Sequence, residues 1–101
     1  MRTAARTDRN HTDVMGWFRD MGCTVTDLSG VGQGVYDLLV GMTAWHGPHT
    51  IAVEVKDGAK PASKRKRTPA QVEWGDNWKG DKAIVENQAD CIDLVNSRKR
   101  K

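Results

Sequence analysis

The sequence is poor in cysteine, and it lacks any apolar stretch long enough to cross a lipid bilayer. Its two cysteines, Cys23 and Cys91, form neither a CxxC pair nor a zinc-type cluster, so we expect two free thiols in a reducing compartment. A membrane span needs about 20 consecutive apolar residues, and no segment approaches that length. The arginine-bearing N-terminus also lacks a signal-peptide pattern. These absences predict a soluble, intracellular protein without a membrane partner.

Missing motifs exclude several kinds of active site. The glycine-rich segment Ser29–Tyr36 matches neither GxGxxG nor the P-loop pattern, and it leads into an expected strand rather than a helix. No serine lies in a pattern typical of a Ser/His/Asp nucleophile. His46 and His49 flank a Gly-Pro pair, which is typical of a turn, and two histidines alone do not fill a structural zinc shell. We therefore expect no small-molecule cofactor and no structural zinc.

The positive charge is concentrated in two blocks. Residues 64–67 and 98–101 hold half of the sixteen lysines and arginines, so the other eight face thirteen acidic residues and leave the body at a net charge of −5. Such a distribution suits a phosphate-binding surface beside an acidic metal site. The alternative, a solvated segment, is favoured for the C-terminal block and less so for the internal one. The candidate nucleic-acid contacts are Lys60, Lys64, Arg65, Lys66 and Arg67.

Hydrophobic periodicity and turn residues predict one α/β domain over residues 1–101, with residues 1–9 and 98–101 as flexible basic ends. The expected helices are residues 10–21, 68–80 and 87–97, and the expected strands are residues 23–28, 36–43, 50–56 and 82–85. The strand–helix–strand unit from residue 51 to residue 85 implies a parallel pair with a right-handed crossover. The predicted order is α-β-β-β-α-β-α, with a central mixed sheet flanked by helices.

The second and third expected strands bring charged residues together. Residue numbers opposite each other in a hairpin sum to a constant, so a turn over residues 44–49, centred between residues 45 and 48, places Asp37 near Glu54 and Lys56. Side chains alternate along a strand, so Glu54 and Lys56 share one face, expected to be solvent-exposed, while Val55 points into the core. The alternative is a plain cross-strand salt bridge.

This group suits a hard divalent cation. Magnesium takes oxygen ligands and is usually held by one or two carboxylates plus substrate phosphate oxygens. Asp37, Glu54 and the backbone carbonyl of Val55 are the candidate metal ligands, with Mn²⁺ expected to substitute for Mg²⁺. Lys56 is expected to orient or deprotonate a metal-polarised water, or to stabilise negative charge on an attacked phosphate.

A capping-box pattern starts the second helix. Thr68 is the expected N-cap, Pro69 the first helical residue and Gln71 the third, so Gln71 has a complete structural explanation. Trp74 and Trp78, four residues apart, are expected to pack against the sheet. Trp45, at the hairpin tip, is the aromatic residue most expected to be exposed.

Four blocks, taken in order, resemble the PD-(D/E)xK nuclease superfamily and, within it, the VRR-NUC branch. They span residues 8–96: an amphipathic helix ending at Gly22, the glycine-rich approach to Asp37, the Glu-Val-Lys segment, and a helix similar to the family's Thr-x-x-Gln-x-x-Trp motif. The resemblance implies a restriction-endonuclease-like fold and a magnesium-dependent DNA endonuclease. It further implies catalytic roles for Asp37, Glu54, Lys56 and Gln71, a branched-DNA substrate such as a Holliday junction, a homodimer, and a cytoplasmic location, in the host if a phage encodes the chain.

Two positions depart from the family pattern. Tyr36 stands where a proline usually precedes the catalytic aspartate, which affects the stiffness of the strand entry and not the chemistry. The first-helix glutamate that supports the metal is absent, and Asn10-His11 occupies the matching turn. Either His11, Asn10 or Asp13 substitutes, His11 being the additional candidate ligand, or fewer protein ligands hold the metal. The alternative to a metal-supporting role is that His11 is exposed and that Asn10 caps the helix. A nucleic-acid-binding or scaffold module that has lost catalysis is therefore the alternative function.

Overall fold

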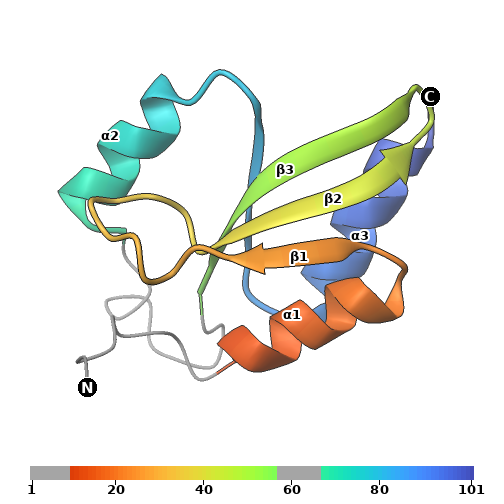
Figure 1. Ribbon diagram of the computed structural model, residues 1–101, viewed down its shortest axis with the longest axis horizontal. Coiled ribbons are helices and arrows are strands. Elements are labelled where there is room, and N and C mark those ends of the chain that lie inside the picture. The colour runs from red at the N-terminus through yellow and green to blue at the C-terminus, as the bar shows by residue number, and fades with distance from the viewer. Residues whose placement is uncertain (1–9, 57–66) are drawn as a thin grey trace.

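The computed structural model describes residues 10–56 and 67–101, which fold into a four-stranded sheet and three helices. The elements follow one another as predicted, α-β-β-β-α-β-α. In chain order they are α1 (His11–Asp20), β1 (Thr24–Asp27), β2 (Leu38–Ala44), β3 (Gly47–Val55), α2 (Pro69–Asn77), β4 (Asp81–Val85) and α3 (Gln88–Lys99) (Figure 1). The predicted α/β class with a mixed sheet is therefore confirmed.

The strands lie in the order β1-β2-β3-β4. The pairs β1–β2 and β2–β3 are antiparallel, whereas β4 runs parallel to β3, as the predicted crossover requires. Leu38 lies opposite Val53 and Ala44 opposite Gly47, so facing residue numbers in the hairpin sum to 91. This register fixes which side chains of the two central strands share a face.

The hairpin turn is tighter than predicted. The sequence suggests a broad turn from residue 44 to residue 49, but only Trp45 and His46 separate β2 from β3. Gly47 makes the short connection possible because its φ of 118° lies in a region that side chains other than glycine rarely adopt. The turn assignment of His49 is therefore wrong: this residue lies in β3, opposite Met42.

The hydrophobic core lies between one face of the sheet and helices α1 and α3, which lie together on that face (Figure 1). Alternate residues of β2 and β3 point into it, because side chains alternate along a strand. Burying each such Val, Leu or Ile side chain contributes about 1.5–3 kcal/mol. The fully buried members are Val14, Phe18, Leu38, Val40, Ile51, Val53, Val55, Val85, Cys91 and Val95.

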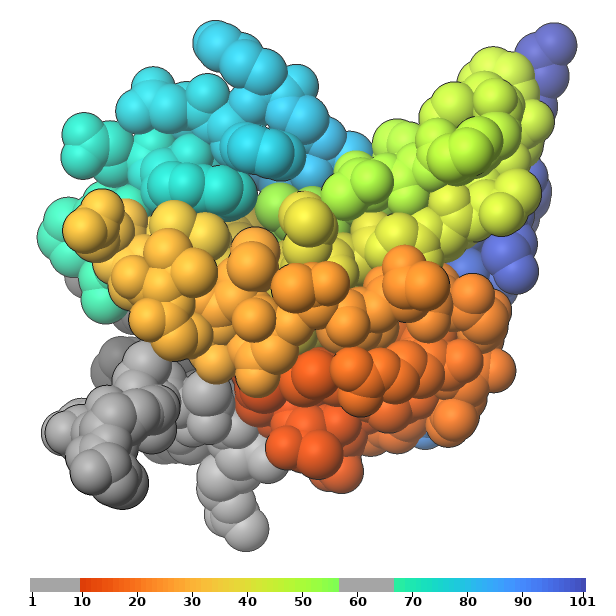
Figure 2. Space-filling view, in the orientation of Figure 1, coloured from red at the N-terminus to blue at the C-terminus, as the bar shows by residue number. Residues whose placement is uncertain are grey.

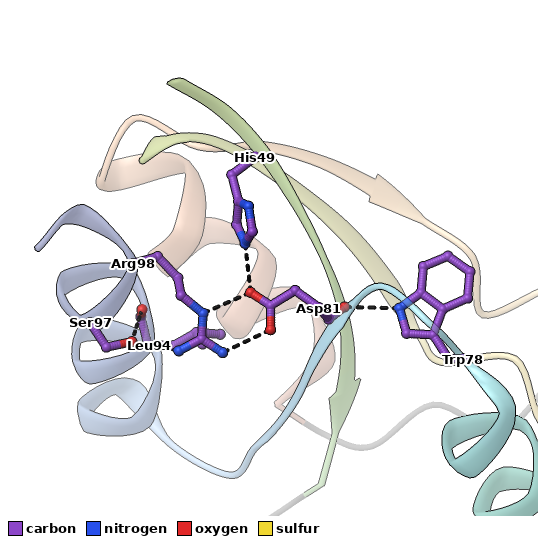
Figure 3. Close-up of polar contacts among 6 residues, drawn as sticks. All are labelled: His49, Trp78, Asp81, Leu94, Ser97 and Arg98. Carbon is purple, nitrogen blue, oxygen red and sulfur yellow. Dashed lines mark hydrogen bonds and ion pairs between the residues drawn. The ribbon is translucent and has the colours of Figure 1, made fainter. Parts of the chain in front are cut away.

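An ion pair fastens the end of the chain to the sheet. The Asp81 carboxylate, at the start of β4, accepts hydrogen bonds from Arg98 Nε at 2.7 Å and Arg98 Nη2 at 2.9 Å (Figure 3). His49 Nε2 lies 2.6 Å from Asp81 Oδ2. The Arg98 hydrogen bonds, with a smaller contribution from His49, outweigh burial and lower the pKa of Asp81 to about 2. Arg98, assigned from sequence to a flexible end, is instead part of α3 and anchored, because a bidentate carboxylate partner is within reach.

Among residues 10–56 and 67–101, no helix is both long enough and apolar enough to cross a membrane.

Candidate functional site

Asp37 and Glu54 meet at the end of the sheet where β2 begins and β3 ends. Asp37 lies one residue before β2, and the hairpin register places it opposite Glu54, as the sequence arithmetic predicts. Its backbone carbonyl accepts the Leu28 N–H at 2.7 Å, which extends the β1–β2 ladder by one step. Its side-chain Oδ2 accepts the Val55 N–H at 2.8 Å. The aspartate is thus bonded to both neighbouring segments and held in one orientation.

Glu54 is a buried carboxylate, which corrects the expectation of a solvent-facing side chain. Only 1% of it is exposed, and Lys56 Nζ lies 3.2 Å from its Oε2 atom. Lys56 is itself only 12% exposed along its side chain. Glu54 and Lys56 do share a face, as strand alternation predicts. This face is covered by residues from outside the hairpin. A buried carboxylate–ammonium pair needs further hydrogen bonds to offset the desolvation of both charges.

Gln71 supplies those hydrogen bonds from the first turn of α2. Its Nε2 donates to Glu54 Oε2 at 2.5 Å, and its Oε1 accepts from Lys56 Nζ at 3.2 Å. The same Oε1 accepts the Thr68 N–H at 3.0 Å, while Thr68 Oγ1 accepts the Gln71 N–H at 3.2 Å. The capping box is therefore present, and the capping residue also binds both charged groups of the site. The capping interpretation of Gln71 is therefore confirmed, and its catalytic role stays a prediction.

Tyr36 positions the helix that carries Gln71. Its side chain is buried, its ring centroid lies 4.9 Å from that of Trp74, and its hydroxyl accepts from Arg67 Nη1 at 3.4 Å. A Cβ added to Gly75 would lie 2.5 Å from the Tyr36 hydroxyl, so only glycine allows this approach. Tyr36 therefore anchors α2. No local pattern in the sequence signals this contact.

The glycine-rich segment also contacts α2. A Cβ on Gly34 would lie 2.2 Å from the Ala70 carbonyl oxygen, and Gly34 has a φ of 81°, so a side chain is excluded there twice over. Figure 2 shows this segment, in amber, directly against the teal surface of α2. The segment is thus a backbone support for α2 that leads straight into Asp37.

The start of α1 closes the same end of the sheet. Asn10 Nδ2 donates to the Lys56 carbonyl at 3.2 Å and to the Glu86 carbonyl at 3.0 Å, and so ties the ends of β3 and β4 together. Asn10 occupies the N-cap position of α1, but its side chain makes no capping hydrogen bond. The expected capping role is therefore wrong, because two strand-end carbonyls lie within reach of the amide.

His11 is buried rather than exposed, and its Nε2 lies 3.3 Å from Asp27 Oδ1. Burial acts to raise the pKa of Asp27, but hydrogen bonds from Ser29 and the nearby His11 together leave it lowered. Asp27 lies opposite Leu38, so its side chain is on the face covered by α1, whereas Glu54 is on the other face. We therefore leave His11 out of the ligand set proposed below.

Most of the predicted basic contacts cannot be placed. Lys60, Lys64, Arg65 and Lys66 lie outside the described residues, as does the basic end at residues 1–9. Arg67 is described, and its contact with Tyr36 places it beside α2. Trp45 is 56% exposed, as predicted, with Lys101 Nζ 5.9 Å from its ring centroid. Trp74 and Trp78 stack on each other, and the Trp78 indole N–H donates to the carbonyl of Asp81, the first residue of β4.

The donor set at the site is made of oxygens. The part of the chain that the structure describes contains no group of three or more His, Cys, Asp or Glu side chains placed to hold a metal. Two opposed carboxylates and the Val55 carbonyl nevertheless match the sparse oxygen coordination that suits Mg²⁺, which keeps several waters or phosphate oxygens as ligands. Asp37, Glu54 and the Val55 carbonyl, all oxygen donors, therefore stay the candidate magnesium ligands.

Comparison of the chain with models of protein families, with curated proteins and with solved structures finds no match in any of the three. The proposal below therefore depends on the chemistry of the described residues and on the resemblance carried by the four sequence blocks.

Proposed function

We propose that the protein is a magnesium-dependent DNA endonuclease with a restriction-endonuclease-like fold, similar to the VRR-NUC branch of the PD-(D/E)xK nucleases. The observation that carries the proposal is the contact of Glu54 with both Lys56 and Gln71, beside Asp37, which directly precedes the adjacent strand β2. Three segments far apart in the sequence bring these side chains to one point. A salt bridge on a solvated face would need neither the burial nor the third residue.

Each residue has a distinct role in the proposed reaction. Asp37, Glu54 and the Val55 carbonyl would hold Mg²⁺, and the bound ion would supply Lewis-acid polarisation of a water molecule and the scissile phosphate. The Lys56 ammonium stabilises the negative charge that develops on that phosphate. Gln71 holds the Glu54 carboxylate and the Lys56 ammonium in place with the two ends of one amide. The hydrogen bond from Val55 N–H holds the Asp37 carboxylate.

The partner we propose is branched DNA, with a four-way junction as the leading candidate and two copies of the chain acting together. The cationic segment at residues 60–67 begins five residues after the end of β3, so it supplies positive charge close in sequence to Lys56. Contacts of lysine and arginine with phosphates position the duplex without reading its sequence. Selectivity for structure rather than for sequence agrees with this composition.

The test is cleavage of a panel of labelled single-stranded, duplex, flapped and four-way-junction DNAs with Mg²⁺ or Mn²⁺ and with EDTA. Near-isosteric changes keep the buried site filled: Asp37→Asn, Glu54→Gln and Lys56→Met. Each should lower the cleavage rate by a factor on the order of 100 or more, as losses of groups that stabilise transition-state charge do. Asp93→Asn, an exposed carboxylate on α3, is the matched control and should cleave at the wild-type rate. Wild-type rates from any of the three site variants would defeat the assignment.

A binding module without catalysis is the second candidate. Glu54 Oε2 already contacts Lys56 and Gln71, and the missing first-helix glutamate reduces the ligand set. This candidate predicts DNA binding that is equal with magnesium and with EDTA, and no cleavage of any substrate in the panel. The same panel therefore separates the two functions.

A further inference from the structure

Three aromatic rings form a ladder along α2 that continues to the protein surface. The Tyr36 and Trp74 ring centroids lie 4.9 Å apart, and those of Trp74 and Trp78 lie 5.0 Å apart with planes only 14° from parallel. Tyr36, at one end, is buried, whereas Trp78, at the other end, is 37% exposed. The Trp78 indole N–H donates to the Asp81 carbonyl at 3.0 Å, which fixes the orientation of the exposed ring (Figure 3).

A surface hollow of about 310 Å³ opens beside this ladder, lined by Gln33, Ala70, Glu73, Trp74, Asn77 and Trp78. The two indoles give it aromatic surface. Around them, the Gln33 and Asn77 amides each offer donors and acceptors, and the Glu73 carboxylate offers acceptors. Aromatic surface combined with mixed donors and acceptors matches a flat heterocycle with a polar edge, which is the chemistry of a nucleobase. The negative charge of Glu73 disfavours a phosphate in the same place.

Gln33 occupies a conformation that favours glycine. Residues 32, 33 and 34 all have positive φ, at 76°, 58° and 81°, and Gln33 is the one described residue other than glycine with this property. A side chain at such a position costs stability relative to glycine. The two neighbours are glycines, and Gln33 instead retains an amide at the edge of the hollow. Gln33 can therefore be tested for a binding role separately from folding.

We infer that the hollow binds one unpaired nucleobase, packed against the exposed part of the Trp78 ring and the edge of Trp74 and hydrogen-bonded by Gln33, Asn77 and Glu73. Trp74 follows Gln71 by three residues, so the two lie about 4.5 Å apart along the axis of α2. A base in the hollow would therefore lie within about one turn of α2 from Gln71, the residue that contacts Lys56. The placement of a DNA strand rests on the proposed function, whereas binding of a base does not require cleavage.

The four tryptophan indole N–H signals in a ¹H–¹⁵N correlation spectrum provide the test, once Trp→Phe replacements have assigned them. The titrants are adenosine monophosphate, a duplex with one unpaired adenine, and the same duplex with an abasic residue in its place, all in EDTA so that nothing is cleaved. We expect ring-current shifts at Trp74 and Trp78 but not at Trp45, and roughly tenfold weaker binding of the abasic duplex. Equal affinity for both duplexes, or shifts at Trp45 alone, would overturn the inference.

Variants separate binding from folding. Gln33→Gly relieves the positive-φ strain, so it should keep or raise the melting temperature while weakening binding of the unpaired base several-fold. Asn77→Ala, on the exposed side of α2, should weaken binding in the same way, and Trp45→Phe is the control that should not. Unchanged affinity in both Gln33→Gly and Asn77→Ala would refute recognition of the base edge.

Further comparisons identify the source of the base and keep this inference apart from the proposed function. A similar affinity for adenosine monophosphate and for the duplex with the unpaired adenine identifies a free nucleotide as sufficient, whereas response to the duplex alone identifies a base within a strand. Indole shifts without any cleavage would defeat the proposed nuclease and leave this inference standing. Cleavage without indole shifts would refute this inference and leave the proposed nuclease standing.

Discussion

At the scale of single residues, Gln71 performs two tasks that substitutions can separate. Gln71→Glu keeps an acceptor for the Thr68 N–H, so the helix start is preserved. It loses the N–H donor to Glu54 and places a second carboxylate against it, so we expect cleavage to fall by a factor on the order of 100. Thr68→Ala is the complementary change: it removes the cap and costs about 1 kcal/mol of stability, yet it keeps the Glu54 contact and the activity. Rates and urea unfolding of both variants give the comparison, and retained activity in Gln71→Glu would limit Gln71 to capping.

The sequence predicts some of these residues and not others, for a physical reason. Asp37, Glu54 and Lys56 can be grouped from sequence because hairpin register and strand alternation are local rules. The capping box is likewise local. Asn10 bonds to the carbonyls of Lys56 and Glu86, which lie 46 and 76 positions further along the chain. The burial of Glu54 depends on where α2 docks. Contacts of that kind depend on three-dimensional packing and leave no periodic signal.

At the scale of elements, the docking of α2 on Tyr36 is the feature most sensitive to mutation. Gly→Ala inside a helix usually stabilises it by about 0.5–1 kcal/mol, and Gly16→Ala in α1 should do so because a Cβ there meets nothing within 4 Å. Gly75→Ala should instead destabilise by about 1–3 kcal/mol, since the added methyl group collides with the Tyr36 hydroxyl. It should also reduce cleavage by displacing Gln71. Thermal unfolding of the two variants checks this, and equal stabilisation by both would mean that α2 is not held by Tyr36.

The Asp81–Arg98 pair that joins β4 to α3 should make stability depend on acid. Because the pKa of Asp81 is lowered in the folded state from 3.8 to about 2, the pair stabilises the fold above about pH 4, and this contribution is lost as the pH falls from about 4 to about 2. Arg98→Met should therefore cost about 1–2 kcal/mol at pH 6, and the difference from wild type should shrink at pH 2.5. Urea unfolding at the two pH values measures it, with Lys99→Met as the exposed control on the same helix. A cost that does not change with pH would show that Arg98 acts through packing and not through its charge.

At the scale of the whole molecule, the order of elements and the mixed sheet follow from hydrophobic periodicity and from the crossover rule for parallel strands. The position of α2 cannot be derived from these two rules. Its attachment depends on close backbone approaches at Gly34 and Gly75 and on the ring of Tyr36. Glycines and a single aromatic residue have many possible roles in a sequence, so three-dimensional packing is needed to choose among them.

The proposed site at Glu54 bears on how many copies of the chain act together. The proposed site at Glu54 would cut one strand, whereas resolving a four-way junction needs two cuts in opposed strands, and two-fold pairing is the commonest assembly of soluble proteins. We therefore expect light scattering to give about twice the chain mass of 11.2 kDa, and a four-way junction to receive paired nicks at symmetric positions. Mixing wild-type chains with an excess of Glu54→Gln chains should convert paired nicks into single ones, because most of the dimers that contain a wild-type chain would then carry one intact site. A monomer at micromolar concentration that cuts linear duplex as readily as the junction would contradict the paired assembly and leave the nuclease assignment standing.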